Sequence, residues 1–176
     1  MRRRDFVLRG LAVGITTWSR AVRAAPAPDS TLNFYHIHTR EHLKVNYREQ
    51  GRILPDALDA IAHLLRDFRR QETHPIEVAL LDTLSALYER FERRGHFEVI
   101  SGYRAPRTNE ALRRVTTGVA KDSLHLHGRA IDIRLTSADT ATLRDAALSL
   151  QQGGVGYYPE SKFVHIDTGR LRSWQG

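Results

Sequence analysis

The chain has 176 residues, of which 41% are hydrophobic, enough for one domain with a substantial core and too few for two. Its net charge of +7 is concentrated in residues 1–24, which hold six arginines and one aspartate and leave only +2 for the rest. That balance, with no basic run interleaved with aromatic residues, excludes nucleic acid as a partner. The absence of cysteine excludes disulfides and restricts any metal site to nitrogen and oxygen ligands.

Residues 1–25 have the features of an export signal: a charged start, a short apolar segment interrupted by Arg9, and small residues suited to cleavage after Ala24, Ala25 or Ala27. The stretch "RRDFVL" resembles the twin-arginine type of signal. The apolar segment is too short to span a bilayer, so we expect a periplasmic protein that is not an integral membrane protein once the signal is removed. The alternative is a basic helix lying on a membrane, but its polar residues do not share one helical face.

The sequence predicts a linker over residues 26–31 and a single domain over residues 32–176. A β-hairpin is expected over residues 31–54, where apolar and polar residues alternate on either side of "TREH". A helix is expected to open at Pro55 and run through Phe68, and a second to follow Pro75 and stop at Gly95, because apolar residues recur at helical spacing in both.

From Phe97 the pattern changes to short strands. Strands are predicted over residues 97–104, 129–135, 154–158 and 163–169, with helices near residues 108–116 and 138–150. The last two strands are close enough for a hairpin across "PESK". We therefore predict an α+β fold, with a small, mostly antiparallel sheet and flanking helices.

The strand periodicity points to a polar site. In "RAIDIRL", Asp132 lies on the face opposite the aliphatic side chains, and in "FVHID" His165 does the same. If the two strands are neighbours, Asp132 and His165 share a site that His125, just before the turn at Gly128, can also reach. Two imidazoles and one carboxylate would leave a tetrahedral zinc ion with one open position.

Periodicity alone also allows a simpler interpretation, because a strand histidine is more often a surface or hydrogen-bonded residue than a ligand. Six other histidines lack partner spacing, and we interpret them as structural or solvent-facing. They are His36, His38, His42, His63, His74 and His96.

The stretch "SLHLHGRAIDI" matches SxHxxGxAxD, the metal motif of the zinc peptidases that include D-Ala-D-Ala carboxypeptidases and the hedgehog-like fold. The upstream "SGYRAPRTNEAL" resembles the SGYR segment of the same group, and "GGVGYYPESKFVHIDTG" resembles the carboxyl-terminal hairpin that carries its third ligand. With the twin-arginine-like signal, these motifs cover nearly the whole chain. They most closely resemble the periplasmic murein endopeptidase K group.

The resemblance implies one Zn²⁺ per chain, held by His125, Asp132 and His165. Arg104 matches the SGYR arginine, whose expected role is to bind a substrate carboxylate or the oxyanion formed when water attacks the peptide carbonyl. The alternative for Arg104 is a salt bridge that closes a loop. Ser123 is expected to bind substrate or support a ligand, or else to cap a local turn.

The general base is less well defined. Several relatives in the wider group carry an acid three residues before the last histidine, where this chain has Lys162, and lysine is a poor base near neutral pH. Asp167 is our candidate because it lies on the same strand face as His165; the other reading is that it accepts a hydrogen bond from a ligand histidine. Glu160 and His127 are further alternatives.

The function that the resemblance implies is zinc-dependent murein endopeptidase activity on peptide cross-links or stem peptides of peptidoglycan, by a monomer. The substrate's carboxylates and its extracytoplasmic location agree with Arg104 and the export signal. A non-catalytic, zinc-stabilised wall-binding or interaction domain is the alternative, which the departure at Lys162 keeps open. A metal-free binding domain would leave the order of the three ligands unexplained. Which peptidoglycan bond is cleaved stays open at this point.

Overall fold

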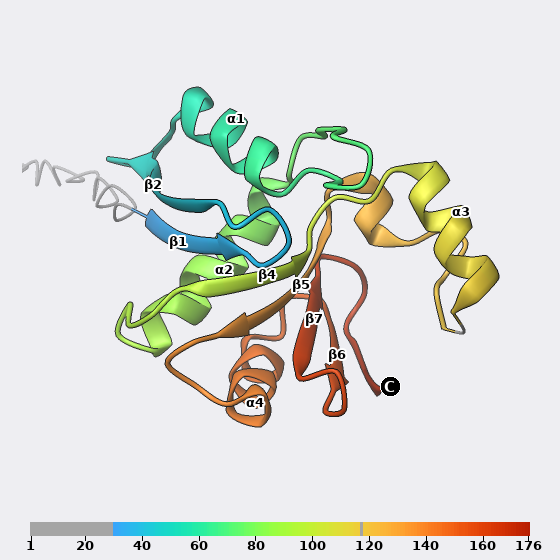
Figure 1. Cartoon of the computed structure of the whole chain (residues 1–176). Coiled ribbons are helices and arrows are strands. Elements are labelled where there is room, and N and C mark those ends of the chain that lie inside the picture. The colour runs from blue at the N-terminus through green and yellow to red at the C-terminus, as the bar shows by residue number, and fades with distance from the viewer. Residues whose placement is uncertain (1–29, 117) are drawn as a thin grey trace, which may run out of the picture.

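The computed structural model describes residues 30–116 and 118–176, which form one eight-stranded sheet with helices packed against it (Figure 1). The strands are β1 (Ser30–His36), β2 (His42–Glu49), β3 (Arg52–Ile53), β4 (Phe97–Ser101), β5 (Ala130–Leu135), β6 (Gly154–Tyr158), β7 (Phe163–Asp167) and β8 (Arg172–Gln175). The helices are α1 (Pro55–Leu64), α2 (Val78–Arg90), α3 (Pro106–Val115), the 3-10 turn η1 (Leu124–His127) and α4 (Thr140–Leu150).

The strand order is β3-β2-β1-β4-β5-β7-β6-β8, and neighbours are antiparallel except for β1 with β4 and β6 with β8. The predicted α+β class and mostly antiparallel sheet are therefore confirmed. Both predicted hairpins form, β1 with β2 and β6 with β7. Strands β5 and β7 are adjacent and antiparallel, which is the arrangement that a shared site for Asp132 and His165 requires.

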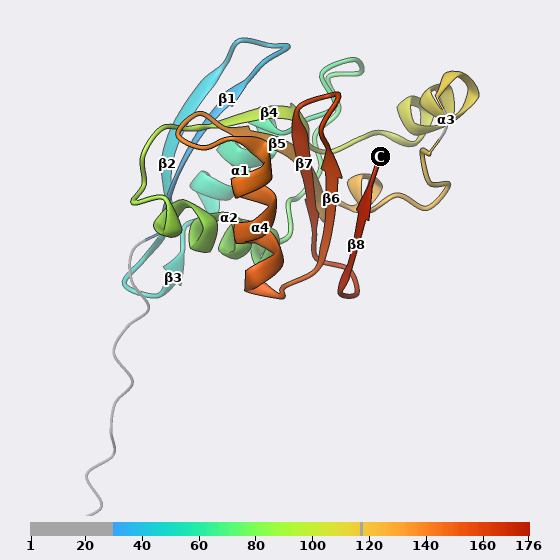
Figure 2. The same ribbon diagram turned by 90° about the horizontal axis from the view of Figure 1, so that it is seen from below.

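The core lies between the sheet and the helices α1, α2 and α4, which gather on one side of it (Figure 2). The alternating aliphatic residues of β5 and β7, Ile131, Ile133, Val164 and Ile166, are at most 2% exposed and belong to this cluster. Their burial leaves the intervening side chains of the two strands on the opposite face. The alternation that places these aliphatic residues in the core thus also determines the face of the sheet on which the site residues lie.

The first predicted helix is too long at its carboxyl end, because α1 stops at Leu64 and Phe68 lies in the following loop. The reason is local hydrogen bonding. The Arg66 guanidinium donates to the His63 carbonyl, and Asp67 Oδ1 accepts from the amides of Arg69 and Arg70, so these groups are satisfied without a further helical turn.

Other differences are at element ends. Ser30 and Thr31, assigned to the linker, belong to β1, and the predicted strand 97–104 stops at Ser101. Neither η1 nor β8 was expected. The predicted export signal and the rest of the linker fall in residues 1–29, outside the described residues. Among the described residues, no helix combines the length and apolar composition needed to cross a membrane.

Candidate metal centre

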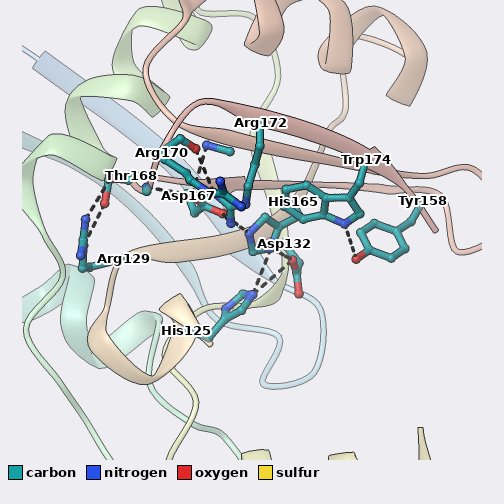
Figure 3. Close-up of polar contacts among 12 residues, drawn as sticks. His125, Arg129, Asp132, Tyr158, His165, Asp167, Thr168, Arg170, Arg172 and Trp174 are labelled. Atoms are coloured by element: carbon teal, nitrogen blue, oxygen red, sulfur yellow. Dashed lines mark hydrogen bonds and ion pairs between the residues drawn. The ribbon is translucent and has the colours of Figure 1, made fainter. Parts of the chain in front are cut away.

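Three side chains from three separate elements converge on one point: His125 from η1, Asp132 from β5 and His165 from β7 (Figure 3). Asp132 Oδ1 lies 3.3 Å from His125 Nε2 and 2.9 Å from His165 Nδ1, and the two ring nitrogens are 3.3 Å apart. Within residues 30–116 and 118–176 this is the one group of three or more such side chains that could hold a metal ion.

The sheet and one sharp turn bring these residues together. Asp132 and His165 are directly opposite each other in the β5–β7 register. His125 is brought over them by η1, which ends at Gly128 in the left-handed conformation (φ 62°). A Cβ at Gly128 would lie 2.1 Å from the Pro75 carbonyl oxygen, so this close turn needs glycine for space as well as for conformation.

Hydrogen bonds on the outer side of each ring fix which nitrogen faces the centre. His125 Nδ1 lies 2.7 Å from the Gly102 carbonyl, which can only accept, so Nδ1 carries the proton and the Nε2 lone pair faces Asp132. His165 Nε2 lies 2.8 Å from Asp167 Oδ2, so Nε2 donates and Nδ1 faces the centre. Two imidazoles that each direct one ring nitrogen to the centre in this way, with one carboxylate, fit zinc.

The electrostatics of the group favour a positive charge at its centre. Burial opposes ionisation of Asp132, but His125 and His165 outweigh it and hold the pKa of Asp132 well below its usual range. Burial likewise disfavours charge on His165, yet its hydrogen bonds to Asp132 and Asp167 raise its pKa to about 9. Burial lowers the pKa of His125, which keeps that ring neutral. A divalent cation between these groups would supply the positive charge that the carboxylates of Asp132 and Asp167 favour.

Asp167 lies on the other side of the His165 ring from Asp132 (Figure 3). It is 1% exposed, and its oxygens accept from His165, from Arg172 at 2.6 and 3.0 Å, and from the amides of Gly154 and Gly169. Every one of these contacts is to a donor, and none is to the centre of the ligand group. The imidazole separates Asp167 from the point where the three ligand atoms meet.

The other residues considered as the base lie elsewhere. His127 is exposed and contacts Asp122 at 2.9 Å, and Glu160 is exposed in the β6–β7 turn. Lys162 ends that turn with φ 55°, and its carbonyl accepts from Arg134. Among the described residues, no hydrogen bond or ion pair joins any of these three to the ligand group.

Arg104 lies beside the ligand group with few partners of its own. Its side chain is 13% exposed, and its guanidinium is 3.9 Å from Asp132 Oδ2 and 3.3 Å from Asn109 Oδ1. Both distances are long for an arginine that is so buried. Its backbone amide donates to the His125 carbonyl at 3.0 Å, which joins the "SGYR" segment to the metal motif. Ser123 is buried at the start of η1, and its side chain makes no cap hydrogen bond.

One side of the site is formed by Trp174 and Tyr158, which the sequence did not indicate. The Trp174 ring centroid is 5.2 Å from that of His165, and Nε1 donates to Tyr158 Oη at 2.9 Å. Trp174 lies on β8, opposite Gly156, where an added Cβ would be 2.6 Å from the indole. Gly156 therefore leaves the space that the Trp174 ring occupies, and no periodicity in the sequence predicts the strand that carries this ring.

A family model described as peptidoglycan L,D-endopeptidase MepK matches residues 24–174. This chain belongs to the MepK family. The Escherichia coli (strain K12) peptidoglycan L,D-endopeptidase MepK is 38% identical over 176 residues, which covers 98% of this chain and 96% of that protein. The probable MepK of Haemophilus influenzae is 36% identical over 179 residues, covering 99% and 96%. No solved structure matches the chain significantly. The MepK match confirms the resemblance to murein endopeptidases that the motifs indicated.

Proposed function

We propose that this chain is a zinc-dependent peptidoglycan endopeptidase that hydrolyses L,D-peptide bonds in cross-links or stem peptides. The observation that carries the proposal is the convergence of His125, Asp132 and His165, with Nε2 of His125 and Nδ1 of His165 directed inward, beside the weakly paired Arg104. The bond type is taken from the names of the two MepK relatives, a peptidoglycan L,D-endopeptidase in Escherichia coli and a probable one in Haemophilus influenzae. The wall-peptide substrate agrees with an arginine suited to carboxylates.

His125, Asp132 and His165 would hold the zinc ion. When bound, zinc acidifies a coordinated water and polarises the peptide carbonyl. The Gly102 carbonyl and Asp167 hold the outer nitrogens of the two rings, which keeps the inner lone pairs available and correctly aimed. Trp174 covers the His165 ring on one side and excludes solvent there.

Arg104 would bind the substrate on the open side of the centre. A guanidinium that is mostly buried and has only long contacts gains strongly from an incoming oxygen anion. This supports either expected role, a substrate carboxylate or the developing oxyanion. Because Arg104 is tied through its backbone to His125, its position relative to the ligands is fixed before substrate arrives.

The contacts of Asp167 support the second of its two expected roles, that of an acceptor which orients His165. Both of its oxygens are saturated by donors, and the imidazole lies between it and the ligand atoms. We therefore propose Asp167 as a positioning residue rather than the general base. The base itself stays a prediction to be tested at Glu160 and His127, and Ser123 stays a candidate for substrate binding.

Several finer features are also proposals. The "SxHxxGxAxD" match and the order of the elements support a hedgehog or D-Ala-D-Ala-peptidase type of fold for residues 32–176. A periplasmic location, export by a twin-arginine signal within residues 1–25, and a monomeric state follow from the sequence features and the substrate. The non-catalytic alternative, a zinc-stabilised wall-binding domain, is favoured by one observation, the lysine at the usual acid position.

The test is zinc content combined with peptide release from purified peptidoglycan, with and without a chelator. We expect one zinc per chain, product release that chelation abolishes, and loss of most of the zinc in His125→Ala and His165→Ala. His127→Ala is the matched control for zinc content alone, since it removes an exposed histidine of the same motif. Zinc bound at full stoichiometry without any release would favour the wall-binding domain. Full zinc in both ligand variants would refute the assigned ligands.

A further inference from the structure

We propose that Arg69, in the loop after α1, forms a second anion-binding position next to Arg104 and binds a second carboxylate of the peptidoglycan stem peptide. This inference rests on the proposed function and concerns substrate recognition by the same site. Arg104 would serve the carboxylate or oxyanion nearest the metal centre, and Arg69 a carboxylate farther along the peptide.

Asp67 fastens the Arg69 loop to the segment that carries Arg104. The Asp67 side chain is in the core region, 2% exposed. Its Oδ1 accepts from the Arg69 amide at 2.9 Å, and its Oδ2 accepts from the Ala105 amide at 2.9 Å. The two oxygens belong to one carboxylate, so a single side chain joins the backbone at Arg69 to the backbone just after Arg104.

A second set of contacts keeps these two segments side by side. The Tyr103 amide donates to the Leu65 carbonyl at 2.8 Å. At Gly102 an added Cβ would be 2.5 Å from the same carbonyl oxygen, so the glycine permits the close approach. The loop and the "SGYR" segment therefore form one edge of the site, and the Gly102 carbonyl within it also accepts a hydrogen bond from Nδ1 of the ligand His125.

The Arg69 side chain is exposed and is held by a ring instead of an acid. Its guanidinium lies 4.3 Å from the centroid of Phe68, and Phe68 is stacked on His38 with centroids 4.2 Å apart and an interplanar angle of 16°. Within the described part of the chain Arg69 forms no ion pair. Arg66, three residues earlier, is instead buried, and its guanidinium donates to the Glu41 carboxylate at 2.7 and 3.1 Å.

The charges on this edge favour an anionic ligand. Arg69 is one of the charges that act on the buried Arg104 guanidinium, in agreement with the side chain of Asp67 that joins the two segments. Two of the nearby acids are already engaged, Asp132 by the ligand histidines and Asp67 by backbone amides. The third, Glu72, is exposed, and its charge acts on Tyr103. Among the described residues no hydrogen bond joins either guanidinium to an acid, so the pair matches a substrate that bears more than one carboxylate.

The experiment measures the affinity of the zinc-loaded full chain for a synthetic stem peptide that ends in diaminopimelate, with its side-chain carboxyl either free or amidated. Arg69→Gln should weaken binding of the free-carboxyl peptide by about five- to tenfold, the range of one exposed charge-assisted hydrogen bond. It should leave binding of the amidated peptide unchanged. Zinc content and thermal unfolding should match those of the unaltered protein.

Arg70→Gln is the matched control, because Arg70 is the adjacent exposed arginine whose amide contacts the same carboxylate. An equal loss in Arg70→Gln would mean diffuse attraction and would overturn the proposal. So would an unchanged affinity in Arg69→Gln, or an equal loss for both peptides. Affinity is measured without turnover, so the two proposals can fail separately. A protein that binds the peptide but releases nothing from peptidoglycan would refute the endopeptidase proposal, while the effect of Arg69→Gln on affinity would still test this one.

Discussion

His165 and Asp167, two residues apart on β7, are joined by a 2.8 Å hydrogen bond between Nε2 and Oδ2 (Figure 3). Side chains at this spacing lie on one face of a strand with Cα atoms about 7 Å apart, so the contact requires the ring to lean along the strand. Arg172 from β8 completes the row by binding both oxygens of Asp167. The orientation of a ligand histidine on β7 thus depends on an arginine of β8, two strands away in the sheet.

Asp167→Asn should weaken zinc binding by about 10- to 100-fold, the usual cost of disturbing a group that orients a ligand histidine. The neutral amide loses the ion pair with Arg172 and holds the Nε2 proton less strongly. Zinc affinity by competition with a chelator, and peptide release at rising zinc concentration, measure the effect. We expect activity to recover at saturating zinc. Activity that stays about a hundredfold low at full zinc occupancy would restore Asp167 as the base.

Arg104→Lys should retain the fold and zinc yet reduce turnover by at least about tenfold, which corresponds to about 1.4 kcal/mol in the barrier. Lysine keeps the charge but lacks the planar fork that binds two oxygens at once. The comparison is kcat/KM on purified cross-linked peptides for the two proteins at equal zinc content. Rates equal to those of the unaltered protein would show that Arg104 only closes the loop through Asn109 and Asp132.

Gly156→Ala should displace the Trp174 indole, because the new Cβ would lie 2.6 Å from two atoms of that ring. A side chain forced to move in this way costs about 1–3 kcal/mol of stability. The expected signs are a lower unfolding midpoint and a change in tryptophan emission as the Trp174 to Tyr158 hydrogen bond is lost. A Trp174→Phe protein gives the contribution of Trp18 for subtraction. An emission spectrum identical to that of the unaltered protein would contradict the close contact.

Stability should fall in mild acid because of His36, which is 0% exposed and whose Nε2 has no hydrogen-bond partner among the described residues. Burial, followed by the neighbouring His38, lowers the pKa of His36 from 6.5 to about 4. The unfolded chain therefore takes up a proton before the folded chain does. Stability is full above about pH 6.5 and decreases toward pH 4, by about 3 kcal/mol at most.

Denaturant unfolding of the metal-free protein at pH 7 and at pH 4.5 measures this dependence. His36→Asn keeps a side-chain acceptor for the amides of His38 and Thr39 but removes the titrating imidazole. This variant should be less stable than the unaltered protein at pH 7, and its free energy of unfolding should depend less on pH. His63→Asn, at an exposed position, serves as the control. An equal decrease with acid in His36→Asn and the unaltered protein would assign the effect to other groups.

The sequence was sufficient for the parts of the molecule in which one pattern decides the structure. The alternation in β5 and β7 predicted that Asp132 and His165 share a face, and the register pairs them directly. The six histidines without partner spacing stay out of the one group of ligand type found in the described residues. Both hairpins follow from alternation interrupted by short turns.

Features that depend on distant contacts could not be read in this way. Phe68 continues the helical spacing of α1, yet Asp67 binds the amides of the next residues and ends the helix. Asp167 shares a strand face with His165, which is compatible with a base or with an acceptor, and only Arg172 and the amides around it distinguish the two. Trp174 reaches the site because β8 pairs in parallel with β6. No pattern in the sequences of these two segments predicts that pairing.

The strands at the two ends of the sheet are its shortest ones. Among the described residues, β3 has two residues and β8 has four, whereas β1 and β2 have seven and eight. An incoming strand from another molecule needs a row of unpaired amides and carbonyls to bind, and each end of this sheet offers very few. The order of the strands thus places the long pairing segments in the interior and leaves little template for β-aggregation.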